Sequence, residues 1–120
     1  MKEFEYEAIF YDLPDGSEPA LDFLKSLDIK MRAKLERSIL LLQQVGPKLR
    51  LPYSEHLDDG IFEIRAKQGS NITRILYFFF VGKKIILTNG FIKKTQKTPK
   101  NQIKLAKKYR FEYQSRGGAE

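Results

Sequence analysis

Hydrophobic and polar residues alternate along residues 3–11, and this alternation predicts a strand. One face of the segment carries the apolar side chains of Phe4, Tyr6, Ala8 and Phe10. The opposite face carries the carboxylates of Glu3, Glu5 and Glu7. A period of two with one apolar face is typical of a strand that buries only one of its faces.

The spacing of apolar residues becomes helical after the turn signal Pro14-Asp15-Gly16. Ser17 is expected to cap a short helix that accommodates Pro19 in its first turn. Asp28 is expected to cap a second helix, which Gly46-Pro47 ends. The apolar stripes of the two helices are Leu21, Phe23, Leu24 and Leu27, and then Met31, Leu35, Ile39 and Leu42. Together these segments predict a helical hairpin.

The second half of the chain predicts an antiparallel meander. Residues 47–60 are polar and are expected to form a loop. A strand is expected at 61–67, where apolar and charged residues alternate, and Gly69-Ser70 marks a hairpin turn after it. Residues 72–81 are apolar on both faces except at Thr73 and Arg74, so they predict a central strand. Residues 85–92 predict the last strand.

A basic helix is expected to end the domain, with Thr98 as its cap and Pro99 at its first position. Its narrow apolar stripe is Ile103, Ala106, Tyr109 and Tyr113. The order β-α-α-β-β-β-α predicts one α+β domain over 1–113, an antiparallel sheet packed by the N-terminal helical hairpin and the C-terminal basic helix. Residues 114–120 contain Gly117-Gly118 and are expected to be a flexible tail.

Composition excludes several classes of function. The chain has 120 residues, no cysteine and one histidine, so disulfides, thiolate zinc sites and cysteine nucleophiles are excluded. The lone His56 cannot form a multi-histidine metal site, and no cofactor is expected. The longest apolar run, residues 75–81, is far shorter than the roughly 20 residues of a membrane helix, so no membrane partner is expected. The acidic start without an apolar segment argues against a secretory signal. The lack of cysteine suits the reducing cytoplasm, which is the expected location.

The net charge of +7 conceals an asymmetry between the two halves of the chain. Residues 1–60 hold 8 basic and 12 acidic side chains, whereas residues 61–120 hold 14 basic and 3 acidic ones. Residues 93–110 contain eight basic side chains and no acidic one. Such clustering indicates a polyanionic partner such as a nucleic acid. The alternative is a solvated basic helix without a ligand.

Arginine and lysine side chains on the predicted strands are the best candidates for chemistry. Serine-hydrolase, P-loop and dinucleotide signatures are absent. If the strands are neighbours, Arg65, Arg74 and Lys93 converge on one concave surface. Burying the Arg74 guanidinium among apolar residues costs several kcal/mol unless it faces a ligand or pairs with an acid such as Glu63. Both readings of Arg74 stay open from sequence.

Three segments resemble the HigB-like, phage-derived branch of the RelE/ParE toxin superfamily: DGIFEIR (59–65), TRILYF (73–78) and NGFIKKTQKTP (89–99). The resemblance implies a toxin of a type II toxin–antitoxin system. Its expected partners are a HigA-like helix-turn-helix antitoxin, in a heterotetramer on DNA, and messenger RNA, which is cut mostly while it sits in the A site of the ribosome. The implied activity is metal-independent RNA cleavage, which inhibits translation and growth.

The resemblance also assigns candidate residues. In the implied reaction the 2′-hydroxyl of RNA attacks the adjacent phosphate, and cationic groups stabilise the developing charge. The implied catalytic residues are Arg65, Arg74, Lys93, Lys94 and His56. The implied RNA-binding residues are Phe91, Lys67, Lys97, Lys100, Lys104, Lys107 and Lys108. Asn89-Gly90-Phe91 lacks the histidine of better-known HigB enzymes, so a lysine, Lys93 or Lys94, is expected to act as the general base.

Two other functions fit the same charge pattern. A ParE-like gyrase poison would act by binding a protein without hydrolysing RNA. A basic RNA-binding module would bind RNA with a steep salt dependence and would not cleave it. An arginine placed within an apolar strand favours the enzyme, because a phosphate-tracking module needs cations only at its rim.

Overall fold

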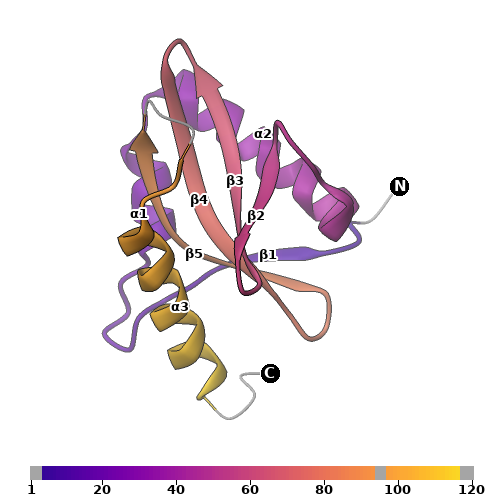
Figure 1. Ribbon diagram of the computed structural model, residues 1–120, viewed down its shortest axis with the longest axis vertical. Coiled ribbons are helices and arrows are strands. Elements are labelled where there is room, and N and C mark those ends of the chain that lie inside the picture. Colours follow the sequence, from indigo (N-terminus) through magenta and orange to yellow (C-terminus); the bar gives the residue numbers. More distant parts are fainter. Residues whose placement is uncertain (1–3, 94–96, 117–120) are drawn as a thin grey trace.

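The computed structural model describes residues 4–93 and 97–116, which form an α+β fold (Figure 1). Five strands build a single sheet, and helices cover both of its faces. The elements are β1 (Glu7–Phe10), α1 (Pro19–Ser26), α2 (Ile29–Val45), the short 3-10 helix η1 (Gly46–Lys48), β2 (Ser54–Asp58), β3 (Ile61–Gln68), β4 (Asn71–Phe80), β5 (Lys84–Lys93) and α3 (Lys100–Gln114).

The strand order is β1-β5-β4-β3-β2, so β4 is the central strand as its apolar sequence predicts. The predicted antiparallel meander of β3, β4 and β5 is confirmed. The prediction of a wholly antiparallel sheet is wrong, because β1 lies parallel to β5. A parallel neighbour needs a long crossover connection. The chain provides one, because it passes through α1, α2 and the three strands β2–β4 before β5 begins.

The segment 47–60 does not form only a loop, because its residues 54–58 make the edge strand β2. This strand pairs antiparallel with β3, and Glu55 faces Glu63 while His56 faces Phe62. An edge strand has one neighbour and is largely exposed, so it needs no alternation of apolar residues. The polar sequence therefore concealed it.

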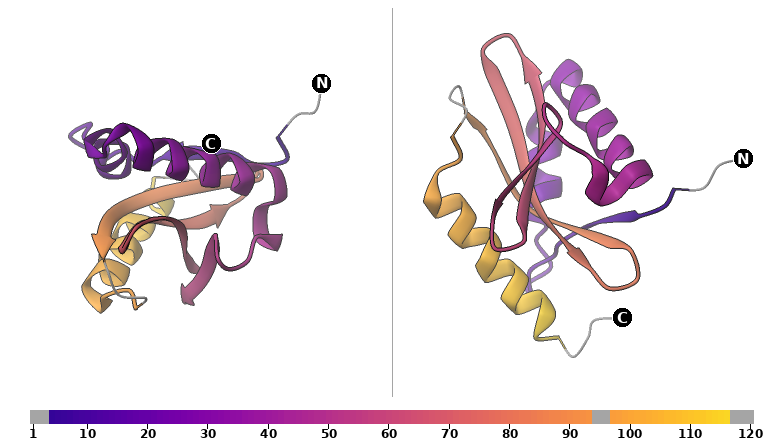
Figure 2. Two further views of the ribbon diagram at one scale, coloured as in Figure 1. Left: turned by 90° about the horizontal axis from the view of Figure 1, so that it is seen from above. Right: turned by 45° about the vertical axis from the view of Figure 1, so that its right-hand side comes forward.

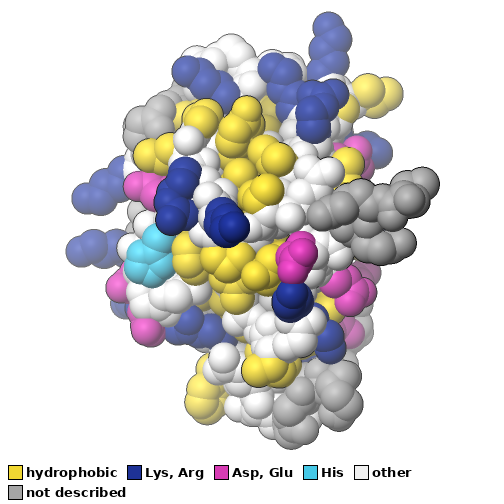
Figure 3. Space-filling view, turned by 90° about the vertical axis from the view of Figure 1, so that its right-hand side faces the viewer, with side chains coloured by type: hydrophobic (Ala, Val, Ile, Leu, Met, Phe, Trp, Pro, Cys, Tyr) yellow, Lys and Arg dark blue, Asp and Glu magenta, His cyan; other side chains and the backbone are white. Residues whose placement is uncertain are grey.

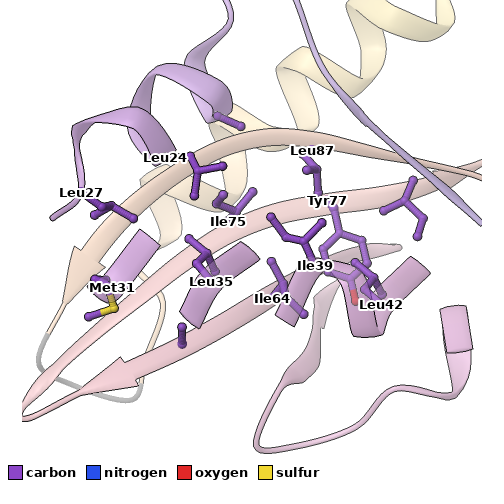
Figure 4. Packing of buried hydrophobic residues seen from close by; sticks show 13 residues of the cluster. Leu24, Leu27, Met31, Leu35, Ile39, Leu42, Ile64, Ile75, Tyr77 and Leu87 are labelled. Carbon is purple, nitrogen blue, oxygen red and sulfur yellow. The ribbon is translucent and has the colours of Figure 1, made fainter. Parts of the chain in front are cut away.

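The helical hairpin packs on one face of the sheet and α3 on the other (Figure 2). Figure 4 shows the larger core, in which the predicted stripe of α2 meets side chains of β3, β4 and β5. A second cluster joins Tyr11, Leu76, Phe78 and Ile86 to Ala106 and Tyr113 of α3. The predicted apolar stripes of α2 and α3 are thus confirmed.

The predicted cap is confirmed for α2 but not for α1 and α3, although Pro19 does lie in the first turn of α1. The Asp28 carboxylate accepts a hydrogen bond from the Met31 backbone N–H at 2.8 Å, and α2 ends at Val45 before Gly46. Ser17 is not a cap, because its hydroxyl donates to Asp15 instead. Thr98 is not a cap either, because its side chain bonds across to β3 and β4, and α3 starts after Pro99.

The predicted tail falls partly outside the described residues. Gln114, the first residue of the predicted tail, is the last residue of α3, and residues 117–120 are not described. Within the described ranges, no helix is both long and apolar enough to span a bilayer.

Candidate functional site

The register of β3, β4 and β5 places the predicted site residues in two rows across the sheet. One row runs from Arg65 through Arg74 to Phe91, and the next runs from Lys67 through Ile72 to Lys93. Directly paired residues on neighbouring strands point to the same face of a sheet. We call the surface formed by Arg65, Lys67, Arg74, Phe91 and Lys93 the cationic face. It lies on the side of the sheet that carries α3, because Phe91 packs against the cluster beneath that helix.

Arg74 is completely buried within this face. Its Nη1 atom donates to Thr98 Oγ1 at 3.0 Å and lies 3.8 Å from Glu63 Oε1. Its guanidinium lies 5.8 Å from the centre of the Phe91 ring, within reach of a cation–π interaction. The structure therefore shows the pairing with Glu63. Burial lowers the pKa of Arg74, and nearby Arg65 lowers it further, whereas Glu63 opposes both effects.

Glu63 links the two arginines of the cationic face. Its Oε2 atom accepts from Arg65 Nε at 2.5 Å, and its Oε1 atom accepts from Thr98 Oγ1 at 2.5 Å. Arg65 also bonds through Nη2 to Glu55 at 2.7 Å, and its side chain remains 11 % exposed. These bonds fix the orientation of both guanidinium groups. Among the described residues of this face, Lys67 and Lys93 are exposed.

Several lysines extend the positive charge from this face onto α3 and the residues before it. Lys97, Lys100, Lys104 and Lys108 are exposed. Lys107 differs, because its Nζ atom lies 2.6 Å from Asp58 Oδ2 and so lowers the pKa of that carboxyl group. Arg110 bonds to Asp59 at 3.0 Å in the same way. Asp58 ends β2 and Asp59 lies in the turn to β3, so these two ion pairs fasten α3 to the β2–β3 hairpin.

His56 lies apart from the cationic face. It pairs with Phe62, whose side chain packs toward the helical hairpin, so it lies on the other face of the sheet from Arg74. Its Nε2 atom accepts from the Gly60 backbone N–H at 3.2 Å, and its ring contacts the Phe62 ring edge-on at 5.0 Å. Lys94 lies outside the described residues. The structure thus brings Arg65, Arg74, Phe91 and Lys93 together and leaves His56 away from them.

Two members of the site were not identified from sequence as such. Glu55 fell in the presumed loop, and Thr98 was expected to cap a helix. The alternation of Glu63 with Arg65 in β3 was the available signal for the network, since residues two apart share a face. Among residues 4–93 and 97–116, no group of three His, Asp or Glu side chains is arranged to hold a metal ion.

The family described as phage-derived protein Gp49-like (DUF891) matches residues 22–110 of the chain. This range runs from α1 into α3 and contains the whole cationic face. The chain belongs to this family. The Gp49-like family is one of toxin-like proteins, so the predicted resemblance is confirmed at this level. None of the curated proteins compared with this Gp49-like chain matches it.

Proposed function

We propose that this Gp49-like protein is the toxin of a toxin–antitoxin pair and cleaves messenger RNA as a HigB-like endoribonuclease. The observation that carries the proposal is the cationic face, where cations of three adjacent strands lie beside an aromatic ring. Exposed lysines at the corners of this face suit RNA phosphates. A partly buried Phe91 beside them suits a stacked base.

The chemistry assigned to the face is transfer of a phosphate within the RNA itself. The 2′-oxygen forms a bond to the adjacent phosphorus, and the bond from phosphorus to the 5′-oxygen breaks. The products are a 2′,3′-cyclic phosphate and a 5′-hydroxyl. One proton leaves the attacking hydroxyl and one reaches the leaving oxygen. Lys93 or Lys94 is proposed for the first of these transfers.

Arg65 and Arg74 have different roles in this proposal. The Arg65 side chain is 11 % exposed and lies in the row next to that of the exposed Lys67 and Lys93, so its guanidinium is proposed to stabilise charge on the phosphate oxygens. Arg74 is fully buried beneath that surface and is proposed as a positioning residue. It acts through Glu63, which it shares with Arg65, and through the ring of Phe91. Through these contacts Arg74 would hold Arg65 and Phe91, the two groups proposed to touch RNA.

One competing function keeps specific support. Because Arg74 pairs with Glu63, the buried arginine no longer requires a ligand. A basic RNA-binding module without catalysis therefore also fits the cationic face. Such a module would bind RNA and leave it intact.

The test is cleavage of end-labelled messenger RNA by the full chain, with and without ribosomes, followed by analysis of the product ends. Wild type is expected to yield 2′,3′-cyclic phosphate ends. Lys93→Ala and Arg65→Ala are expected to lose about 100-fold or more in cleavage rate. Lys48→Ala, an exposed lysine of η1 away from the face, serves as the matched control and is expected to cleave normally.

Two outcomes would overturn the proposal. Wild type that binds RNA with a steep salt dependence but leaves it intact would establish the binding module. Wild type that leaves RNA intact and instead causes DNA breaks through gyrase would establish the gyrase poison.

A further inference from the structure

A groove of about 800 Å³ lies between α2 and the free end of β3. The edge strand β2 pairs with β3 only as far as Ile64, and the Arg65 backbone N–H then donates to the Tyr53 carbonyl at 2.7 Å. Beyond that point α2 is the neighbour of the β3 edge. On the side of the molecule that carries α2 and β2, hydrophobic side chains gather near the middle, and lysines, arginines, acidic side chains and the histidine lie around them (Figure 3).

The groove has an aliphatic floor and a cationic border. Its cations are Lys34, Arg37, Arg65 and Lys67, and none of the described side chains that line it is Asp or Glu. The apolar lining consists of Leu40, Leu41, Pro52, Tyr53, Ala66 and Ile72. Leu40 is 46 % exposed and Tyr53 is 45 % exposed. An exposed apolar surface with a charged border is typical of a site that binds another molecule.

We propose that this groove binds an acidic peptide segment of a partner protein. An aliphatic side chain of the segment would lie against Leu40 and Leu41, and its carboxylates would pair with Lys34 and Arg37. Charge complementarity selects an acidic occupant. The lining selects a peptide over RNA, because five of its six apolar residues are aliphatic or proline. Nucleic-acid bases are held by aromatic rings, whereas aliphatic pockets accept peptide side chains.

The segment would bind by its side chains and not by adding a strand to the sheet. The β3 carbonyls that point toward α2 already accept hydrogen bonds from that helix. Ser38 Oγ donates to the Arg65 carbonyl at 2.9 Å, and Lys34 Nζ donates to the Lys67 carbonyl at 3.1 Å. An added strand would have to displace both donors. Binding through exposed charges instead weakens as salt rises.

The groove and the cationic face share Arg65 and Lys67. A peptide seated in the groove would therefore compete with RNA for these two cations. This consequence, and only this one, rests on the proposed function. It would make the groove the place where an antitoxin segment neutralises the toxin.

The test uses the full chain and a short fluorescent peptide of alternating Leu and Glu, measured by fluorescence anisotropy. Leu40→Asp and Arg37→Glu, both at exposed positions, are expected to weaken binding by about tenfold or more. Ile29→Asp and Lys48→Glu are matched controls on exposed residues outside the groove, and both are expected to bind normally. A second peptide with Ser in place of Leu is expected to bind weakly to wild type.

The same variants separate this proposal from the proposed function. Saturating peptide is expected to inhibit RNA cleavage by wild type and to spare cleavage by Leu40→Asp. Unchanged peptide binding by Leu40→Asp would overturn the groove proposal even if RNA is cleaved. Weaker binding of a single-stranded RNA by Leu40→Asp, with no peptide binding to wild type, would assign the groove to RNA. A chain that cleaves no RNA but binds the peptide in the groove would overturn only the proposed function.

Discussion

Glu63→Gln tests whether a single buried carboxylate holds the cationic face together. Glu63 and Arg74 are both fully buried, and the Glu63 carboxylate also accepts bonds from Arg65 and Thr98. Glutamine has nearly the same shape and can still accept from Thr98, so the substitution removes the negative charge with little change in packing. It leaves the Arg74 guanidinium buried without its carboxylate partner.

The expected cost is large for one substitution. Removing one partner of a buried ion pair costs about 3–5 kcal/mol, and the retained shape of glutamine places this case near 3 kcal/mol. For a domain of this size, 1 kcal/mol corresponds to about 4 °C in melting temperature, so a loss of about 12 °C is expected. Glu55→Gln is the matched control, because Glu55 binds the same Arg65 but its side chain is 43 % exposed. It is expected to cost no more than about 1 kcal/mol.

Thermal and urea unfolding followed by circular dichroism would measure both variants. A loss below about 1 kcal/mol for Glu63→Gln would refute the argument, since the buried guanidinium would then not depend on this carboxylate. The double variant Glu63→Gln/Arg74→Met provides a second check. It removes the uncompensated charge as well, so it is expected to be more stable than Glu63→Gln alone. Equal or lower stability of the double variant would contradict the reasoning.

Two further predictions concern packing and pH. Gly90→Ala would place a Cβ atom 2.4 Å from Phe23 Cδ2 and 2.9 Å from the Arg74 carbonyl oxygen. The substitution is therefore expected to lower the free energy of unfolding by about 1–3 kcal/mol. An unchanged melting temperature would contradict this expectation. Burial raises the pKa of Tyr11 and of Tyr77 to about 12, from an ordinary value of 10.0. Because these pKa values are raised, the stability that both phenols contribute is full below pH 10 and is lost as pH rises toward 12. Near-ultraviolet titration of tyrosine should show a late transition that Tyr77→Phe diminishes, and an unchanged transition in that variant would rule out the assignment.

The partner of Arg74 is not determined by the sequence. Its position within an apolar strand predicts that it is either paired or facing a ligand, because an unpaired buried cation is too costly. Sequence could not choose between the two, since the choice depends on which side chains the neighbouring strands and the segment before α3 bring to it. The structure places Glu63 and Thr98 there.

Local signals determined most of the elements of this protein. The period of apolar residues, the Asp28 cap and the Gly69-Ser70 turn depend on neighbours close in sequence, so the helices and the meander were predictable. The placement of Arg65 beside Arg74 on β3 and β4 was also predictable from the sequence, because a tight hairpin fixes its own register. The phage-derived, toxin-like family was recognisable from the same segments.

Only the tertiary structure decided the rest. The parallel pairing of β1, the network around Glu63 and the groove beside α2 all join residues that are distant in sequence. The strand β2 pairs with its near neighbour β3, but its polar sequence did not predict a strand. A polar edge strand carries no apolar period, and a groove between a helix and a sheet edge has no motif of its own. Their positions follow from how helices pack on a sheet of fixed register, which the pattern of one chain segment cannot specify.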